Sequence, residues 1–160
     1  MSDPTIDPTP RLLELAADLV QRARNLGADV AEASARTGWE LSAKVRVGKT
    51  ELVEEAGHHG VSLRVIRGGR VATTSTSDLT ASGIERCVAD ALELCALSEP
   101  DPFAGPADAA LLCKPPHPDL QLFDASIDAI DAGYAIEQAR IAERAAFDTD
   151  PRITLSEGAT

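Results

Sequence analysis

The stretch that most restricts the fold is residues 60–83, GVSLRVIRGGRVATTSTSDLTASG. Its opening residues place Val61, Leu63 and Val65 on one face, which predicts a strand with one apolar face. Gly68-Gly69 can adopt the positive φ angles that a two-residue hairpin turn needs. The residues after it are small and β-branched, which suits a returning strand. The stretch therefore predicts a β-hairpin, followed by a polar loop and the start of a helix.

Further strands are indicated upstream of this hairpin. Residues 40–47 alternate clearly, and residues 29–37 alternate weakly. A turn at Gly48-Lys49 would send the chain back through residues 50–57. Joined to the hairpin, these segments predict an antiparallel meander of four to five short strands with one face exposed to water.

Helical periodicity is found in three places. The first helix is expected over residues 9–26, with Thr9 as N-cap, Pro10 in the first turn and Gly27 at its end. The second is expected over residues 80–97 and has Thr80 as its cap. Its apolar stripe consists of Ile84, Cys87, Val88, Ala91, Leu92 and Cys95. A third begins near Asp131 and ends before Pro151. The predicted class is α+β: a β-meander packed by two helices, with a further C-terminal helix.

The chain divides into four segments by composition. Residues 1–8 are expected to be a flexible tail, and residues 9–98 an N-terminal α+β domain. Residues 99–118 hold six of the ten prolines and read as a linker. Its apolar residues Phe103 and Leu111-Leu112 could pin it to the domain.

Residues 119–160 would begin a further region, with short strands at 119–123 and 152–155 around the third helix. The second of these strands has no evident partner for its backbone groups. We therefore expect the chain to be an N-terminal part of a longer protein, a short stand-alone relative being the alternative.

Charge and cysteine content limit the classes of protein to which this chain can belong. The formal net charge of −11 repels phosphate backbones and argues against nucleic-acid binding. The N-terminus lacks the pattern of a signal peptide, and no apolar run has transmembrane length. The three cysteines, Cys87, Cys95 and Cys113, favour thiols in a reducing cytoplasm over disulfides.

The residues do not predict a metal site. His58 and His59 are adjacent, so on a strand they point to opposite faces. Cys87 and Cys95 would lie about 12 Å apart along one helix. The helical His-Glu pattern of zinc peptidases is absent. The acidic groups at Glu51, Glu54 and Glu55, and at Asp124, Asp128 and Asp131, lack the spacing of a calcium loop.

Two other kinds of site, for nucleophilic catalysis and for phosphate binding, have simpler structural interpretations. Ser75, Thr76, Ser77 and Asp78 could approach a histidine, but Ser-Thr-Ser-Asp before a helix is ordinary capping chemistry. Gly68-Gly69 between Arg67 and Arg70 could hold phosphate, but it leads into a strand rather than a helix. No catalytic, cofactor-binding or metal-binding residue is predicted.

A resemblance rests on the order and spacing of several short segments. They are Gly27-Ala28-Asp29, Val45-Arg46-Val47-Gly48 with Glu51 and Glu54, Gly60 to Arg70, Thr74 to Leu79, Asp101-Pro102-Phe103, and Asp150 to Ile153 with Ser156 to Ala159. Together they resemble the N-terminal domain of the TldD/PmbA family, in its PmbA (TldE) branch, also called modulator of DNA gyrase. The similarity covers nearly all of the chain after Pro10.

The resemblance implies a heterodimeric zinc metalloprotease that trims peptides, with the zinc and its His-Glu-x-x-x-His helix in the TldD-type partner. No catalytic residue of that partner can be carried onto this sequence. The expected function is a non-catalytic scaffold or substrate-chamber wall, whose exposed sheet edge takes an unfolded peptide or a partner strand. Expected partners are a TldD-type subunit and peptide substrate, without nucleic acid or membrane. The alternative is a stand-alone peptide- or protein-binding module without protease activity.

Overall fold

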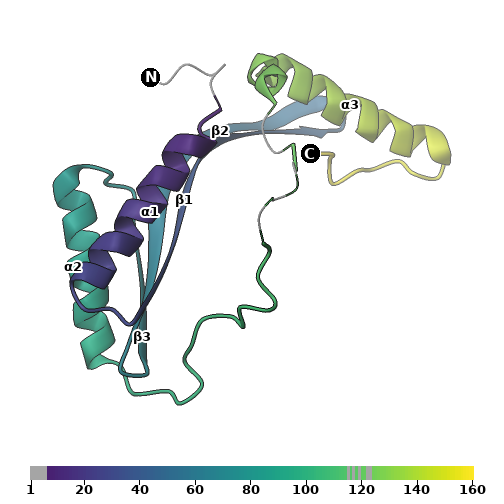
Figure 1. Cartoon of the computed structure of the whole chain (residues 1–160). Coiled ribbons are helices and arrows are strands. Elements are labelled where there is room, and N and C mark those ends of the chain that lie inside the picture. Colours follow the sequence, from purple (N-terminus) through teal and green to yellow (C-terminus); the bar gives the residue numbers. More distant parts are fainter. Residues whose placement is uncertain (1–6, 115, 117, 119, 122–123) are drawn as a thin grey trace. The chain divides into compact units, whose positions relative to one another are not determined.

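The computed structural model describes residues 7–114, 116, 118, 120–121 and 124–160. Its elements are α1 (Thr9–Asn25), β1 (Val30–Arg46), β2 (Lys49–Arg67), β3 (Arg70–Thr76), α2 (Ala81–Leu97), a 3-10 turn η1 (Ala125–Ala129) and α3 (Ala132–Thr149), as Figure 1 shows. The described strands form one antiparallel sheet in the order β1-β2-β3. The predicted α+β class is confirmed.

The predicted number of strands is wrong. The structure has three long strands in the described residues, because β1 continues through Gly38 and β2 continues through Gly57 and Gly60. None of these glycines has a positive φ. A Cβ atom on Gly60 would lie 2.9 Å from the Thr76 carbonyl oxygen, and one on Gly38 would lie 2.9 Å from His58 Nε2. These two glycines allow close approach within the sheet and do not turn the chain.

Two tight turns connect the strands. Gly68 and Gly69 have φ angles of 59° and 73°, and Arg67 pairs with Arg70 across them, so the predicted hairpin is confirmed. The other turn uses Val47 and Gly48, with φ angles of 50° and 71°, and not Gly48-Lys49. The alternation of apolar residues predicted that Val47 lies inside a strand. A turn at Val47 was not expected, because a β-branched residue rarely adopts a positive φ.

The described chain forms two compact units, and β1 and β2 contribute to both. The first, here called the α1–α2 unit, comprises Pro8–Thr37 and His59–Gln121. The second, called the α3 unit, contains Gly38–His58 and the described residues from 124 to 160. The domain boundaries expected at residues 98 and 118 stay a prediction.

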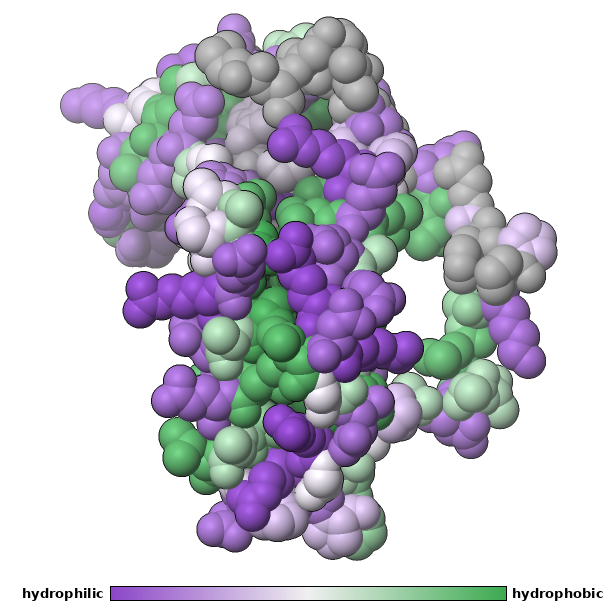
Figure 2. All heavy atoms as spheres, turned by 60° about the vertical axis from the view of Figure 1, so that its left-hand side comes forward, coloured by the Kyte–Doolittle hydropathy of each residue, from purple (hydrophilic) through white to green (hydrophobic). Residues whose placement is uncertain are grey.

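The core of the α1–α2 unit lies where the two helices cover one sheet face (Figure 1). Its most deeply buried members are Leu19, Ala23, Leu63, Val65, Ala91 and Cys95. The predicted α2 stripe is confirmed, with Leu92 packed at its margin. On the face seen in Figure 2, hydrophilic residues surround narrow hydrophobic patches. With so few aromatic residues, small aliphatic side chains and cysteines fill this core.

The ends of α1 only partly match expectation. Gly27 has a φ of 98°, and the N–H groups of Gly27 and Ala28 donate to Arg24 and Ala23 at 3.0 Å, which is a Schellman ending. Thr9 is the first helical residue and not the cap, because Pro8 occupies the N-cap position.

The α3 unit holds the Val47-Gly48 turn against a helix. Asp131 caps α3 by accepting the Tyr134 N–H at 2.8 Å, as its sequence predicts. Glu143, whose residue surface is 3% exposed, accepts the N–H groups of Val47 and Gly48 at 2.7 Å each. Its carboxylate therefore satisfies both donors of a strained turn.

The strand predicted at 152–155 is wrong. Asp150 accepts the Arg152 N–H at 2.8 Å and also binds its guanidinium, so the chain turns immediately after α3. A single antiparallel bridge forms further on, where Val45 and Ala159 exchange backbone hydrogen bonds of 3.0 and 2.9 Å.

The proline-rich segment is held by polar contacts and not by its apolar residues. Phe103 is 93% exposed and Leu111 is 82% exposed, so neither is pinned. The Asp101 N–H instead donates to the Gly69 carbonyl at 2.8 Å, and Arg64 donates to the Gly105 carbonyl at 3.4 Å. Most of the predicted tail, and residues 119, 122 and 123 of the strand expected at 119–123, lie outside the described residues.

The two glycines of β2 give a matched test of close approach. We expect Gly60→Ala to lower the free energy of unfolding by about 1–3 kcal/mol, because the new methyl group meets the Thr76 backbone. Gly57→Ala should change it by less than about 0.5 kcal/mol, since no atom lies within 4 Å of its Cβ position. Urea titration of both variants makes the comparison; equal stabilities would contradict the packing role of Gly60.

Glu143 gives a pH-dependent test. The Gly48 and Val47 N–H groups and the Ser156 hydroxyl hold the pKa of Glu143 below its ordinary 4.5, although burial opposes them. A lowered folded-state pKa adds stability above the unfolded-state pKa, and this stability is lost as pH falls through the folded value. We expect Glu143→Gln to be less stable at pH 7, by a margin that shrinks below pH 4.5. Glu137→Gln, on the exposed side of the same helix, should show no such convergence. A pH-independent margin would refute the assignment.

Candidate functional site

The feature of the α1–α2 unit with functional potential is the outer edge of β3. In a two-residue hairpin the pair closing the turn, Arg67 and Arg70, exchanges both backbone hydrogen bonds, and bonding then alternates along the strand. The N–H and C=O groups of Val71, Thr73 and Ser75 therefore point away from β2. Within the described part of the chain, no other strand pairs with this side of β3.

The inner side of β3 is fixed by α2. The Thr74 hydroxyl donates to the Cys87 carbonyl at 3.1 Å, and the Cys95 thiol donates to the Arg70 carbonyl at 3.0 Å. The Arg70 guanidinium in turn binds the Ser98 carbonyl at the C-terminus of α2, where a cation is favoured. These contacts hold the strand in position while its outer edge stays available.

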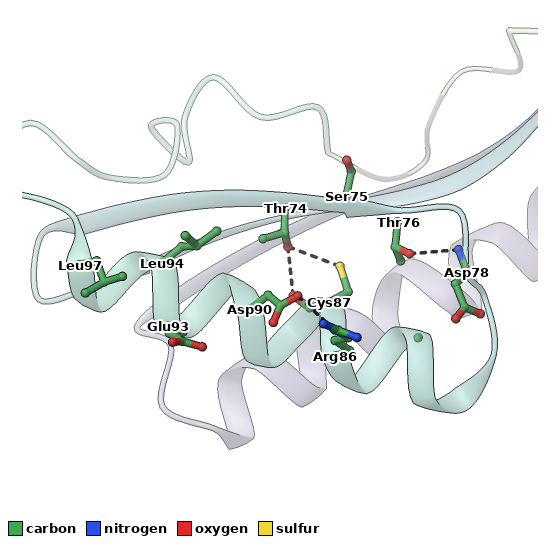
Figure 3. Close-up of a pocket in the computed structure, with 11 residues that line it drawn as sticks. Thr74, Ser75, Thr76, Asp78, Arg86, Cys87, Asp90, Glu93, Leu94 and Leu97 are labelled. Carbon is green, nitrogen blue, oxygen red and sulfur yellow. Dashed lines mark hydrogen bonds and ion pairs between the residues drawn. The ribbon is translucent and has the colours of Figure 1, made fainter.

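A groove of 620 Å³, here called the β3–α2 groove, runs along the helical side of this strand (Figure 3). Asp78, Asp90 and Glu93 make it acidic, and its one arginine, Arg86, lies 3.8 Å from Asp90. The exposed side chains of Leu94 and Leu97 also line it.

A second depression, here called the β-face hollow, lies on the opposite side of β3 and measures 740 Å³. Its lining includes Ser34, Arg36, His59, Gly60, Ser62 and Ser77, and no Asp or Glu of the described residues lines it. Ser75 and Thr76 line both the groove and the hollow. In Figure 3, Ser75 points to the side of the strand opposite to Thr74 and Thr76, so β3 separates the groove from the hollow.

The Ser75–Asp78 segment forms the capping network that its sequence suggested. Asp78 accepts the Thr80 hydroxyl at 2.7 Å and the Thr80 N–H at 3.0 Å, while the Thr80 hydroxyl accepts the Gly83 N–H at 3.2 Å. The Thr80 hydroxyl and N–H hold the pKa of Asp78 below its ordinary 3.8. Asp78 is therefore an anion that positions the start of α2.

The Gly68-Gly69 turn, which was considered as a phosphate site, binds a carboxylate of the same chain. The Gly68 N–H donates to Asp29 at 2.7 Å. Arg70 donates to the Ser98 carbonyl at the end of α2, whose own last turn has no basic residue. Sequence reasoning missed this role because Arg70 belongs to β3 and not to the helix.

The acidic groups also have structural partners. Glu51 pairs with Lys44 at 2.8 Å and Arg46 at 3.6 Å, and chiefly Lys44 lowers the pKa of its carboxyl. Asp124 caps η1, and Asp128 accepts the Trp39 indole N–H at 3.1 Å.

The described residues do not fit a zinc centre. Over the described ranges, no three His, Cys, Asp or Glu side chains gather as metal ligands. His58 and His59 are exposed, and Cys87 and Cys95 are buried along α2. His117 lies outside the described residues.

Comparison with known proteins identifies the family. Residues 31–95 match the family model described as PmbA/TldA metallopeptidase domain 1. The chain is 34% identical over 148 residues to Metalloprotease PmbA of Escherichia coli O157:H7, covering 92% of this chain and 32% of that protein. The chain belongs to the PmbA/TldD family. It is also 37% identical over 120 residues to a Metalloprotease PmbA homolog of Haemophilus influenzae, covering 75% of this chain and 26% of that protein. The chain thus spans a third or less of the length of these relatives.

Solved structures show the same fold. A proposed modulator of DNA gyrase from Bacteroides thetaiotaomicron matches 91% of this chain and 33% of its own, with a TM-score of 0.76 and 23% identity. TldE from Thermococcus kodakarensis matches 86% of this chain and 30% of its own, with a TM-score of 0.59 and 14% identity. The helices described in the structure are all too short or too polar to cross a membrane.

The contact between Asp78 and α2 predicts a cost at Gly83. A Cβ atom there would lie 2.4 Å from both Asp78 Cγ and the Asp78 carbonyl oxygen. We expect Gly83→Ala to destabilise the fold by about 1–3 kcal/mol, although alanine is the better helix former. Gly133→Ala in α3 is the control, because its Cβ would meet only a side-chain oxygen at 3.2 Å. Thermal unfolding of both variants checks this, and a stabilised Gly83→Ala would overturn it.

Proposed function

We propose that this chain is the non-catalytic first domain of a PmbA/TldE-like subunit in a TldD/TldE-type zinc metalloprotease assembly. In this role the outer edge of β3 pairs with an extended peptide and forms part of the wall of the substrate chamber. Family membership supports the setting. The lack of a metal-ligand cluster among the residues the structure describes supports a binding role over a catalytic one.

The observation that carries the proposal is the open edge of β3. Val71, Thr73 and Ser75 present backbone donors and acceptors at the spacing of a β-ladder, and an added strand satisfies them without regard to its sequence. The β3–α2 groove and the β-face hollow flank this strand, so side chains of a paired peptide have space on both sides. Anchorage by Thr74 and Cys95 keeps the edge preorganised.

Zinc binding and peptide cleavage belong to the partner in this proposal. A TldD-type subunit would hold zinc and cleave the peptide that this domain helps to present. The buried thiols of Cys87 and Cys95, neither in a disulfide, agree with a cytoplasmic setting.

The edge can be tested by removing one outward donor. Thr73→Pro deletes an N–H that does not take part in the β2–β3 ladder, and proline is tolerated on edge strands. We expect it to weaken binding of a fluorescein-labelled, C-terminally amidated octapeptide of alternating Gln and Thr by about tenfold, the loss of one backbone hydrogen bond. Thr73→Ala retains the N–H and should bind like the unmodified chain.

Fluorescence anisotropy measures the binding, and circular dichroism shows that both variants remain folded. The peptide should stay uncleaved when zinc is added to this chain alone. Equal peptide affinity in the Pro and Ala variants would rule out the edge as the binding element.

A further inference from the structure

The β-face hollow differs in charge from the rest of the chain. The protein carries 26 acidic and 15 basic residues, yet among the described residues the hollow is lined by Arg36 and His59 and by no acidic side chain. Two other arginines on the sheet have carboxylate partners: Arg64 contacts Glu32 at 2.5 Å, and Arg46 contacts Glu51 at 3.6 Å. Arg36 has no such ion pair within the described ranges.

The floor of the hollow is made of small residues from neighbouring strands. Ser34 lies on β1, Gly60 and Ser62 on β2, and Ser75 on β3. Their short side chains leave the volume open. The Ser62 hydroxyl donates to the Thr74 carbonyl at 3.3 Å, and the hydroxyls of Ser34 and Ser75 can donate hydrogen bonds into the hollow. A cavity with a guanidinium, an imidazole and several hydroxyl donors is complementary to a carboxylate.

The hollow is also placed to meet a peptide at the edge of β3. Successive side chains of a strand point to opposite faces, so every second side chain of a paired peptide lies on the Ser75 side. Adjacent strands are about 4.8 Å apart, which brings such a side chain next to the Ser75 rim. Arg36 lines the same hollow from β1, about two strand spacings from β3. Its neighbours in the peptide face the acidic β3–α2 groove, where a carboxylate would be repelled.

We propose that the β-face hollow is a carboxylate-binding site that selects peptides carrying a Glu or Asp side chain, or a free C-terminal carboxylate, on the Ser75 side of β3. This inference rests on the proposed pairing of a peptide with β3 and adds a substrate class to it. The selected peptide is anionic although the whole chain has a net charge of −11. Preference for a carboxylate therefore comes from the site, because general electrostatics favours the opposite.

Three octapeptides labelled with fluorescein at the N-terminus separate the sources of the carboxylate. The first alternates Glu and Thr and is amidated, so all its carboxylates lie on one face. The second alternates Gln and Thr and is amidated. The third has the second sequence with a free C-terminal carboxylate. Binding to the 160-residue chain is measured by anisotropy at low and at physiological salt.

We expect the first or third peptide to bind about threefold to fivefold tighter than the second, the size of a solvent-accessible ion pair. The first identifies a side-chain carboxylate as the ligand, and the third identifies the C-terminus. Arg36→Gln should abolish the preference. Arg11→Gln makes the same charge change in the exposed first turn of α1 and should preserve it.

The outcomes separate this inference from the proposed function. Equal binding of all three peptides, with Thr73→Pro still weakening each, would refute the carboxylate site and leave the edge intact. A preference that survives Arg36→Gln would also refute it. Absence of binding by every peptide would overturn both proposals.

Discussion

The docking of α2 along β3 is the contact on which the rest of the α1–α2 unit depends. The Cys95 thiol donates to the Arg70 carbonyl, and Thr74 donates to the Cys87 carbonyl, so the strand and the helix are joined by polar contacts inside an apolar core. Small side chains allow the approach, since Ala91 and Cys95 are fully buried. Because β3 pairs with β2 along one edge and packs against α2 by one face, its other edge remains open for a further strand.

The two sides of that edge differ in charge. The groove on the helical side is acidic because Asp78, Asp90 and Glu93 line it, whereas the described lining of the hollow on the other side has basic and hydroxyl-bearing side chains and no acidic one. In the proposed pairing of a peptide with β3, strand geometry would convert this difference into a sequence preference, because neighbouring residues of the peptide face opposite sides. In the proposed function, the domain would thereby contribute to the choice of peptide.

Much of the fold could be predicted from local patterns. The Gly68-Gly69 hairpin, the Thr80 and Asp131 caps and the apolar stripe of α2 depend on residues close in sequence. Predictions were wrong where a residue's role depends on distant atoms: Gly60 makes room for Thr76, and Arg70 reaches the end of α2. The candidate site was predicted only as a sheet edge, because the hollow joins three strands that are far apart in the chain and the groove depends on how α2 packs against β3.

The sequence by itself determined the α+β class, the caps of α2 and α3, one hairpin and family membership, since these follow from short-range periodicity, turn chemistry and the order of short segments. Tertiary structure alone decided that the four to five predicted strands are three long strands in the described residues, that Val47 turns under the carboxylate of Glu143, and that Arg36 lines a hollow in which no described side chain is acidic. The physical reason is that long-range contacts override local propensity: part-buried hydrogen bonds from Val47 and Gly48 to Glu143 hold a β-branched residue at a positive φ, and a neighbouring backbone requires a glycine within a strand.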